Sequence, residues 1–452
     1  MYFIYSLLLG LAILVLLPRF LFDAFHHGKY VAGFRERFGF LTPLPPDGRP
    51  VIWIHCVSVG EAQAARPLVK GLRDRFPNHR LVVSTITKTG QNLAREIFRQ
   101  DVDRVFYFPF DWRWIVRRTL ESINPTVVLI METELWPGFL RECSLRRIPV
   151  AIVNGRLSAQ SFRRYRLIKG FMARVLSSIS MAIMQTEADA ERLRHLGMDA
   201  RKTKVSGNLK FDAGTMAVNN SLTAEFRERF SLDNTSLILA ASTHSPEERI
   251  ILDALKQISS TSSSGVRLMI APRHPERFTE VAGLIESAGL RWIRSSARRT
   301  SDDSEAQVIL LDSIGELQSM YPLAAIVFVG GSISRSGGHN ILEPAAVGAC
   351  IITGPYTHNF HQIVQTFAKA DAVIQLPRIP ESKAQVALAN TISALLANRE
   401  RRDELGKRAQ TLLRNNRGAT QVVLNLLETI IAQSSLASRE VETFRIQDAP
   451  TA

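Results

Sequence analysis

Short apolar runs alternate with amphipathic stretches along most of the chain, and this alternation restricts the fold more than any other feature. Residues 51–57 form a run typical of a buried parallel strand, and residues 62–76 repeat apolar side chains at helical spacing. Further strand-like runs form two series, at 81–86, 105–108, 127–131, 150–153 and 181–185, and then at 237–241, 266–271, 308–311, 325–329, 351–353 and 372–374. The pattern predicts an α/β protein with two Rossmann-like domains facing a cleft, each built on a doubly wound parallel sheet.

Polar and turn-forming residues gather between the two series, at 213–234, and predict an inter-domain linker. We therefore expect an N-terminal domain at 49–212 and a C-terminal domain at 235–433, each large enough to bury a core. Residues 434–452 are polar and predict a frayed tail. The long helical stretch at 401–433 has an alternative placement, packed back on the first domain.

The first 18 residues contain no charged side chain and are rich in leucine, isoleucine and valine. This segment is just long enough for a spanning helix, so the sequence predicts a membrane anchor at 1–22, followed by a basic connector at 23–48. The cations that follow the apolar run place the body of the protein on the cytoplasmic side. One alternative is a monotopic or buried helix. A cleaved signal peptide fits less well because no cationic segment precedes the apolar run.

The chain is basic, with 56 lysines and arginines against 42 acidic residues and a net charge of +14. Such a charge indicates an anionic partner, which is a nucleic acid, a membrane surface or an acidic substrate. Nucleic acid ranks last because no zinc-finger, RNA-binding or helix-turn-helix signature is present. Residues 162–174 interleave cations with large apolar side chains, which favours either an interfacial helix on anionic lipid or a helix with a solvated basic face. The three cysteines, Cys56, Cys143 and Cys350, are far apart and are expected to be reduced.

A glycine-rich stretch, residues 330–344, lies between the strand-like run at 325–329 and a helix-like segment. Glycines allow a ligand to approach the backbone closely, and free N–H groups at a helix start favour a phosphate. Asn340 is a candidate helix cap, and Asn340 and Glu343 are suited to hydrogen bonds with ribose hydroxyls. The alternative is a tight turn that binds nothing, and one glycine-rich turn does not decide between the two.

Ionisable residues follow several strand-like runs of the first half. Glu61 lies in the first turn of the helix after residues 51–57, where we expect the N–H groups and the helix dipole to favour its charged form and its use as a general base. Glu132 and Glu134 follow the run at 127–131, where two acids are costly to bury unless they are paired or used. Lys210 ends a later segment. Each has a structural alternative: helix capping for the glutamates and a solvated side chain for the lysine.

The second half offers two further turns between a strand and a helix. Arg273 follows the run at 266–271 and is suited to a bidentate contact with a phosphate. Residues 312–317 offer backbone N–H and C=O groups to a nucleotide base. We expect no metal, because the sequence has no Cys/His cluster and no acidic metal-binding motif. A P-loop and a nucleophile elbow are also absent from the sequence.

Nine short blocks, spread over nearly the whole chain, carry a resemblance to a known family. They are Ser58-Val-Gly-Glu61, Thr87-Lys-Thr-Gly90, Met131-Glu-Thr-Glu-Leu-Trp-Pro137, Asn154-Gly-Arg-Leu-Ser158, Gln185-Thr-Glu187, Gly207-Asn-Leu-Lys-Phe-Asp212, Ala241-Ser-Thr-His244, Pro272-Arg-His-Pro-Glu-Arg-Phe278 and Gly330–Pro344. Together, in this order and behind a basic N-terminal segment, they resemble the 3-deoxy-D-manno-octulosonic acid (Kdo) transferases of lipopolysaccharide synthesis, glycosyltransferase family 30.

The resemblance implies a GT-B fold and an inverting transfer without metal or cofactor. The donor would be CMP-Kdo, bound by the C-terminal domain, and the acceptor a lipid A precursor (lipid IVA), bound by the N-terminal domain. Glu61 matches the general base of the family. Glu132 and Lys210 match positions assigned to transition-state stabilisation, which leaves Glu134 as a secondary candidate. The positions that match CMP-binding segments are Pro272, Arg273, Ile314, Gly315, Glu316, Asn340, Ile341, Leu342 and Glu343.

The resemblance also implies a place of action, the cytoplasmic face of a bacterial inner membrane. From the charge, the apolar N-terminal segment and residues 162–174, we expect an anionic membrane surface as a partner and no nucleic acid. Small departures from the family are Gly155, where alanine is expected, and Ala62-Gln63 after the base; neither removes a side chain that the reaction needs. The first rival function is another two-domain glycosyltransferase that uses a UDP-sugar on a lipid. The second is a catalytically silent membrane-anchored scaffold, against which the intact ionisable residues argue.

Overall fold

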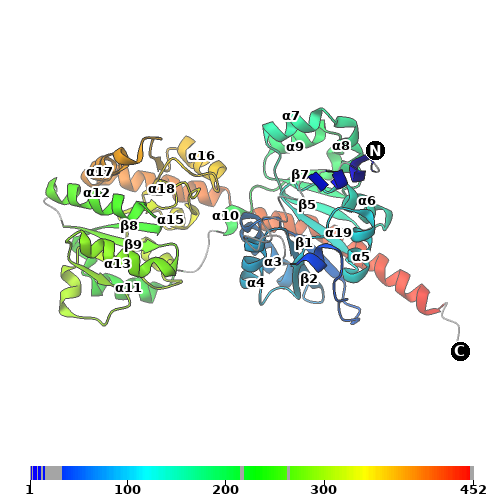
Figure 1. The fold of residues 1–452 in the computed structure, drawn as a ribbon, viewed down its shortest axis with the longest axis horizontal. Coiled ribbons are helices and arrows are strands. Elements are labelled where there is room, and N and C mark those ends of the chain that lie inside the picture. The colour runs from blue at the N-terminus through cyan, green and yellow to red at the C-terminus, as the bar shows by residue number, and fades with distance from the viewer. Residues whose placement is uncertain are drawn as a thin grey trace. The chain divides into compact units, whose positions relative to one another are not determined.

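The computed structural model describes residue 2, residues 4–7, 9–11 and 14–15, and residues 33–213, 218–261 and 265–447. The chain forms two compact units, Met1–Ala213 with Arg417–Ala452, and Gly214–Asn416 (Figure 1). Each unit contains a seven-stranded sheet in which every strand pair given by the register is parallel. The predicted α/β class with two Rossmann-like halves is therefore confirmed.

The sheet of the first unit has the order β3-β2-β1-β4-β5-β6-β7. Its strands are β1 (Val51–His55), β2 (Arg80–Thr85), β3 (Arg104–Tyr107), β4 (Val127–Met131), β5 (Val150–Gly155), β6 (Met181–Met184) and β7 (Thr203–Val205). The helices of this unit are α2 (Phe34–Arg37), α3 (Val59–Arg75), α4 (Lys88–Ile97), α5 (Arg113–Ile123), α6 (Pro137–Leu145), α7 (Ala159–Arg166), α8 (Lys169–Leu176), α9 (Glu187–His195), α10 (Lys210–Ala213) and α19 (Ala419–Gln447).

The packing of β1 explains why residues 51–54 are continuously apolar. Val51 and Trp53 enter the core on one face of the sheet, and Ile52 and Ile54 enter the core on the other face. Because side chains alternate along a strand, a strand with both faces buried favours apolar residues at every position, and the polar residue of β1, His55, lies 2.9 Å from Ser84 Oγ through its Nδ1. All five residues of β1 are buried.

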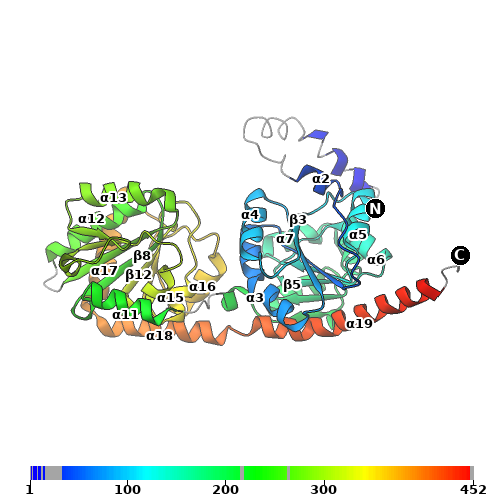
Figure 2. The ribbon, with the colours of Figure 1, turned by 90° about the horizontal axis from the view of Figure 1, so that it is seen from below.

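Helix α19 completes the second of these cores from the far end of the chain. Its residues Val423 and Leu427 are buried in the same cluster as Leu68 of α3, and α19 lies along α3 (Figure 2). Asp212 accepts hydrogen bonds from Gly418 N and Thr420 N, at 2.8 and 2.6 Å, and so satisfies free N–H groups at the start of α19. The alternative placement on the first domain is thus confirmed for the part of the stretch that follows Asn416.

The sheet of the second unit has the order β10-β11-β9-β8-β12-β13-β14. Its strands are β8 (Ser236–Thr243), β9 (Val266–Pro272), β10 (Trp292–Arg294), β11 (Val308–Leu310), β12 (Ile326–Val329), β13 (Ile351–Thr353) and β14 (Ile374–Gln375). Its helices are α11 (Asn220–Arg229), α12 (Glu247–Thr261), α13 (Phe278–Ser287), α14 (Leu317–Met320), α15 (Leu342–Ala346), α16 (His361–Lys369), α17 (Glu381–Ala397) and α18 (Arg399–Asn415).

Three predicted boundaries need correction. The second unit ends at Asn416 and not at residue 433, because α19 packs on the first unit. The predicted linker at 213–234 contains α11, and Phe226 of that helix is buried. The predicted tail at 434–452 is helical as far as Gln447. The three cysteines are free and buried, as predicted.

Most of the predicted anchor at 1–22 and the first part of the connector lie outside the described residues. Within the described residues, no helix has the length and apolar character needed to cross a membrane. Tyr5 OH donates a hydrogen bond to Asp111 Oδ2 at 2.8 Å, and the Tyr2 ring packs edge-on against Phe171 at 5.8 Å between ring centroids. The anchor stays a prediction.

Each sheet has a point where its strand order reverses. Strand β1 lies between β2 and β4, and β8 lies between β9 and β12. In parallel α/β sheets, ligands bind beyond the carboxyl ends of the strands at such a point. The residues that follow β1, β4, β8 and β12 are therefore the ones to inspect.

Candidate active site

Glu61 lies where β1 gives way to α3, at the carboxyl edge of the first sheet. It is the third residue of the helix, and its side chain is buried, with 6 % of the residue exposed. Val57 N donates to Oε2 at 2.7 Å, and Ser58 Oγ donates to Oε1 at 3.0 Å. Each carboxyl oxygen thus has one protein donor, which holds the group in one orientation.

Burial raises the pKa of the Glu61 carboxyl to about 8, from an ordinary value of 4.5. The hydrogen bonds from Val57 and Ser58 lower this pKa, the charges of Glu132 and Glu134 raise it, and desolvation outweighs the hydrogen bonds. The expectation that a helix N-terminus would keep Glu61 ionised is therefore wrong. A carboxyl group whose pKa lies near the operating pH is nevertheless well suited to general-base catalysis.

Glu132 and Lys210 form an ion pair at the same edge. Glu132 directly follows β4, the neighbour of β1, and its φ of 54° ends the strand. Lys210 begins α10, and its Nζ lies 3.5 Å from Glu132 Oε1. The two side chains are 20 % and 23 % exposed, so both are accessible to a ligand. Burial raises the pKa of the neighbouring Glu134, and Glu132 adds to this shift. The structure thus brings the predicted catalytic residues of the first half together, while their roles stay predictions.

Asn154 is a residue of this edge for which the sequence analysis found no role. It is fully buried within β5 and has a φ of 56°. Its Oδ1 accepts a hydrogen bond from Leu209 N at 3.0 Å, which fixes the backbone directly before Lys210. The block at 154–158 contains Asn154, but nothing in that block indicates a partner 55 residues further along the chain.

In the second unit, the glycine-rich loop after β12 surrounds a buried carboxylate. Glu247, the first residue of α12, accepts hydrogen bonds from the N–H groups of residues 331–334, at distances from 2.7 to 3.2 Å. A fifth bond comes from His244 N at 3.0 Å. A Cβ at Gly330 would lie 2.9 Å from Glu247 Oε2 and 2.6 Å from Ser242 O, which explains the glycine. The protein's own carboxylate thus occupies the N–H groups of residues 331–334, whereas the phosphate was predicted at the start of the following helix, α15, and that prediction stays a prediction.

Asn340 and Glu343 contact each other at the start of α15. Asn340 Oδ1 accepts a hydrogen bond from Leu342 N at 3.0 Å, but the N-cap of α15 is Ile341, so Asn340 lies one residue before the cap that was predicted for it. Asn340 Nδ2 donates to Glu343 Oε1 at 3.2 Å, and Tyr321 OH donates to Glu343 Oε2 at 3.3 Å. Burial raises the pKa of both Glu343 and Tyr321. Ile341 and Leu342 are buried, which leaves mainly their backbone groups for a ligand.

Pro272 and Arg273 mark the end of β9. Pro272 is buried, and Arg273 N donates to Thr243 O at 3.0 Å, which ties this turn to the end of β8. The Arg273 side chain is exposed and, in the described part of the chain, forms no ion pair. Its charge nevertheless acts on the carboxyl of Glu343. Arg273 is therefore a cation available to an anionic ligand.

The third predicted nucleotide segment, residues 314–316, lies in the turn after β11. Ile314 is 82 % exposed, and Gly315 has a φ of 91°, which favours glycine. Ser313 Oγ donates a hydrogen bond to Glu316 Oε2. Because β9, β11 and β12 are parallel, the three predicted segments lie at the same edge of the second sheet.

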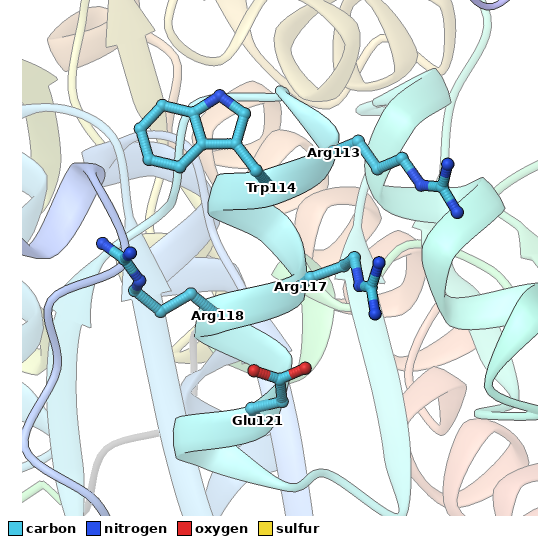
Figure 3. Close-up of a pocket in the computed structure, with 5 residues that line it drawn as sticks. All are labelled: Arg113, Trp114, Arg117, Arg118 and Glu121. Carbon is cyan, nitrogen blue, oxygen red and sulfur yellow. The ribbon is translucent and has the colours of Figure 1, made fainter.

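A separate basic hollow lies on the outer face of α5 (Figure 3). It has a volume of about 510 Å³ and is lined by Arg113, Trp114, Arg117, Arg118 and Glu121. Figure 3 shows Trp114 and Arg118 on one side of the helix and Arg113 and Arg117 on the other. Arg113 Nε donates to Glu142 Oε1 at 2.7 Å. None of the predicted site residues lines this hollow.

Within the described ranges, no group of three or more histidine, cysteine, aspartate or glutamate side chains is placed to hold a metal ion.

Comparison with known proteins shows the family to which the chain is related. The family described as "3-Deoxy-D-manno-octulosonic-acid transferase (kdotransferase)" matches residues 32–213. A 3-deoxy-D-manno-octulosonic acid transferase of Haemophilus influenzae is 35% identical over 411 residues, which covers 90% of this chain and 93% of the relative. The enzyme of the same name from Chlamydophila psittaci is 32% identical and covers 78% of this chain and 81% of the relative.

Solved structures share the fold at low sequence identity. A UDP-GlcNAc 2-epimerase from Neisseria meningitidis, bound to UDP-GlcNAc, is 14% identical with a TM-score of 0.54; the match covers 84% of this chain and 100% of that one. A glycosyltransferase from Rickettsia africae is 12% identical with a TM-score of 0.52, and the match covers 85% of this chain and 99% of that one. These neighbours support a GT-B-like fold.

Proposed function

The chain belongs to the 3-deoxy-D-manno-octulosonic acid transferase family, and from this premise we propose that it transfers Kdo from CMP-Kdo to a lipid A precursor, lipid IVA, with inversion. It is a glycosyltransferase of that family. The observation that supports this proposed reaction best is the Glu61 carboxyl. It is buried beside the point where the strand order of the first sheet reverses, and its pKa is raised to about 8. Such a group is placed and tuned to accept a proton.

In the proposed reaction, Glu61 takes the proton from an acceptor hydroxyl as its oxygen attacks the anomeric carbon of Kdo. The bond between that carbon and the phosphate oxygen breaks, and CMP leaves with the electron pair. The proton ends on Glu61, whose neutral form is favoured by burial. General-base assistance of this kind contributes roughly 10²- to 10⁴-fold to a rate.

Lys210 supplies positive charge close to the base. Its ammonium group is held by Glu132, and its backbone is positioned by the bond from Leu209 to Asn154. We assign to this pair the stabilisation of charge that develops in the transition state. A fixed charge in a partly dehydrated site acts more strongly than the same charge in water.

The nucleotide is proposed to bind at the edge of the second sheet. Arg273 is exposed and unpaired with acids among the described residues, and it is the cation proposed to contact the phosphodiester. Asn340 and Glu343 are proposed to hydrogen-bond the ribose hydroxyls, with Tyr321 orienting Glu343. Because Glu247 occupies the N–H groups of residues 331–334, those groups are not part of the proposed phosphate contact.

We further propose that the enzyme acts at the cytoplasmic face of a bacterial inner membrane, held by residues 1–22 and by anionic lipid. The net charge of +14 supports this proposal, as does the turn between α7 and α8, where Leu167 is 86 % exposed and follows an arginine-rich helix. Flotation of the full chain with vesicles that contain anionic lipid tests it. If all of the protein stayed at the bottom of the gradient while the vesicles floated, the proposal would be contradicted.

The direct test is incubation of the purified protein with CMP-Kdo and lipid IVA, followed by mass spectrometry of the lipid. We expect the mass of at least one Kdo residue to be added and CMP to be released. Turnover of a UDP-sugar, with no use of CMP-Kdo, would replace this proposal with the rival glycosyltransferase.

A further inference from the structure

Two histidines beside the proposed nucleotide edge share one hydrogen bond. His244 follows β8, and His339 lies at the end of the glycine-rich loop. Their Nε2 atoms are 2.8 Å apart, and the ring planes are nearly parallel, with an interplanar angle of 9° and 5.0 Å between centroids. The ring of His274, from the turn after β9, meets His244 edge-on at 5.1 Å. No role has been assigned above to any of the three.

The loop is shaped to hold this pair. A Cβ at Gly331 would lie 2.8 Å from His339 Cδ2 and 2.9 Å from His339 Nε2, so only glycine leaves room for the ring. Glu247 fixes the same loop through the N–H groups of residues 331–334. The close approach of the two imidazoles is thus built into the backbone.

The surroundings of the pair contain both cations and acids, and Arg273 is the arginine among them that forms no ion pair in the described part of the chain. The groups whose charge acts on the pKa of the two rings are Arg273, His274, Arg277 and Glu248. Three further ionisable residues lie on or against the same loops: Glu247, Glu343 and His358. Arg277 is engaged with Glu248 at 2.6 Å and with Glu280 at 2.9 Å. Burial, followed by the neighbouring imidazoles and arginines, lowers the pKa of His339 and of His244. The pair is therefore neutral at neutral pH.

A neutral pair has one donor and one acceptor to offer. One ring donates its Nε2–H to the other, so its own Nδ1 is an acceptor, while the Nδ1 of the second ring carries a proton. One added proton converts the acceptor into a donor and leaves the shared hydrogen bond intact. An anion near the rings favours that protonated form, because an opposite charge nearby raises the pKa of an imidazole.

We propose that His244 and His339, with His274 and Arg273, form an anion subsite of the donor half, and that the imidazole pair takes up one proton when an anionic group of the sugar nucleotide binds. The inference rests on the proposed function, since it assumes a CMP-sugar donor. The chemistry that the subsite recognises is an anionic oxygen group, supplied either by the phosphodiester or by the carboxylate of the sugar acid.

The test measures dissociation constants between about pH 7 and pH 9 in a Glu61→Gln background, which removes turnover and the titration of the base. The probes are cytidine, CMP and CMP-Kdo. With one linked proton, the dissociation constant of an anionic probe rises by up to about tenfold per pH unit. We expect this rise for CMP-Kdo and none for cytidine. A rise for CMP as well assigns the subsite to the phosphate, and a rise for CMP-Kdo alone assigns it to the carboxylate.

His339→Gln and His244→Asn, added to this background, are expected to abolish the pH dependence, whereas His361→Gln on the exposed start of α16 is expected to keep it. Melting curves confirm that each variant is folded. A flat profile for CMP-Kdo with the pair intact overturns the inference, and so does a slope that persists in both pair variants. Absence of any CMP binding in the parent protein would instead contradict the proposed function.

Discussion

Glu61 and Glu247 occupy equivalent places in the two units. Each follows the strand at which the order of its sheet reverses, β1 or β8, and each lies in the first turn of the next helix. Both are buried, and burial raises the pKa of both carboxyl groups. The two residues differ in what the neighbouring loop brings to them.

In the first unit, the loop after β4 places two acidic residues near Glu61. Glu61 receives two hydrogen bonds, from Val57 and Ser58, and faces the charges of Glu132 and Glu134. Its oxygens keep free acceptor capacity, because a carboxylate has about four lone-pair sites. A proton can therefore be taken up, and the group is available for chemistry.

In the second unit, the loop after β12 directs four backbone N–H groups at Glu247. Glu247 receives five backbone hydrogen bonds, one from His244 and four from residues 331–334. Its acceptor capacity is spent on the loop, which it holds in place beside Asn340 and the histidine pair. A glutamate at the same place in the fold is thus the proposed general base in one unit and a structural hydrogen-bond acceptor in the other.

The largest expected effect comes from Glu61→Gln, which keeps the shape of the side chain but removes the base. We expect the transfer rate to fall by about 10³-fold, within the range for loss of a general base. The affinity for CMP is expected to stay within a few-fold, because the base acts on the acceptor. Single-turnover transfer and CMP titration measure the two quantities.

The matched control is Glu187→Gln, at the first residue of α9, where the glutamate is exposed and paired with Arg194. This variant is expected to transfer Kdo at the parent rate. Near-normal turnover in Glu61→Gln would rule out the role of Glu61 and remove the contrast between the two glutamates.

The second effect is on stability. Glu247→Ala leaves five N–H groups without their acceptor in a buried loop, and we expect a loss of about 3 kcal/mol, measured by urea unfolding. The affinity for CMP is expected to fall together with the stability, because the loop positions Asn340, a proposed ribose contact. Glu247→Gln keeps one carbonyl oxygen and is expected to lose less. An unchanged unfolding midpoint in Glu247→Ala would show that the loop does not depend on the carboxylate.

Lys210→Met tests the charge beside the base. We expect turnover to fall by about 10²-fold, comparable with the loss of one electrostatic contact to a transition state, with CMP affinity unchanged. Because Lys210 and Glu132 are paired at 3.5 Å, the double variant with Glu132→Gln is expected to lose less activity than the two single losses combined. Strict additivity in this double-mutant cycle would show that the two side chains act independently.

The smallest effect concerns the glycine that makes room for Glu247. In Gly330→Ala, the new Cβ would lie 2.6 Å from Ser242 O and 2.7 Å from Thr243 Cα, so we expect a loss of about 2 kcal/mol. Gly283→Ala in α13 meets nothing within 4 Å and is expected to raise the free energy of unfolding by about 0.5 kcal/mol. Equal unfolding midpoints for the two variants would refute the close packing at Gly330.

The central strands could be predicted from sequence because burial on both faces leaves an apolar run, as in residues 51–54. The strands β7 and β10 were missed because they are short edge strands, and each carries a cation, Lys204 or Arg294. The order of strand and helix also placed Glu61, Arg273 and Asn340 at the carboxyl edges, since that order alone determines which turn a residue occupies.

Long-range partners could not be predicted. The acceptor for the glycine-rich loop is Glu247, 84 residues before Gly331 in the chain, and nothing local to either residue indicates the other. The start of α19 is held by Asp212 across 206 residues, which is why the predicted domain boundary at 433 failed. The protonation of Glu61 was missed for the same reason, because its desolvation comes from packing that the sequence does not display.

The most direct test of the contrast is the pH dependence of transfer, measured at saturating donor from about pH 6 to about pH 9.5. Because the pKa of Glu61 is raised to about 8 in the folded protein, the base is protonated below that pH. The rate is expected to rise about tenfold per pH unit up to about pH 8 and then to level off. In the same window the folded state holds a proton that the unfolded state, with a pKa near 4.5, has lost, so this group makes stability fall as the pH rises towards 8. A rate that is flat across the whole range would contradict the assignment of Glu61 as the buried base.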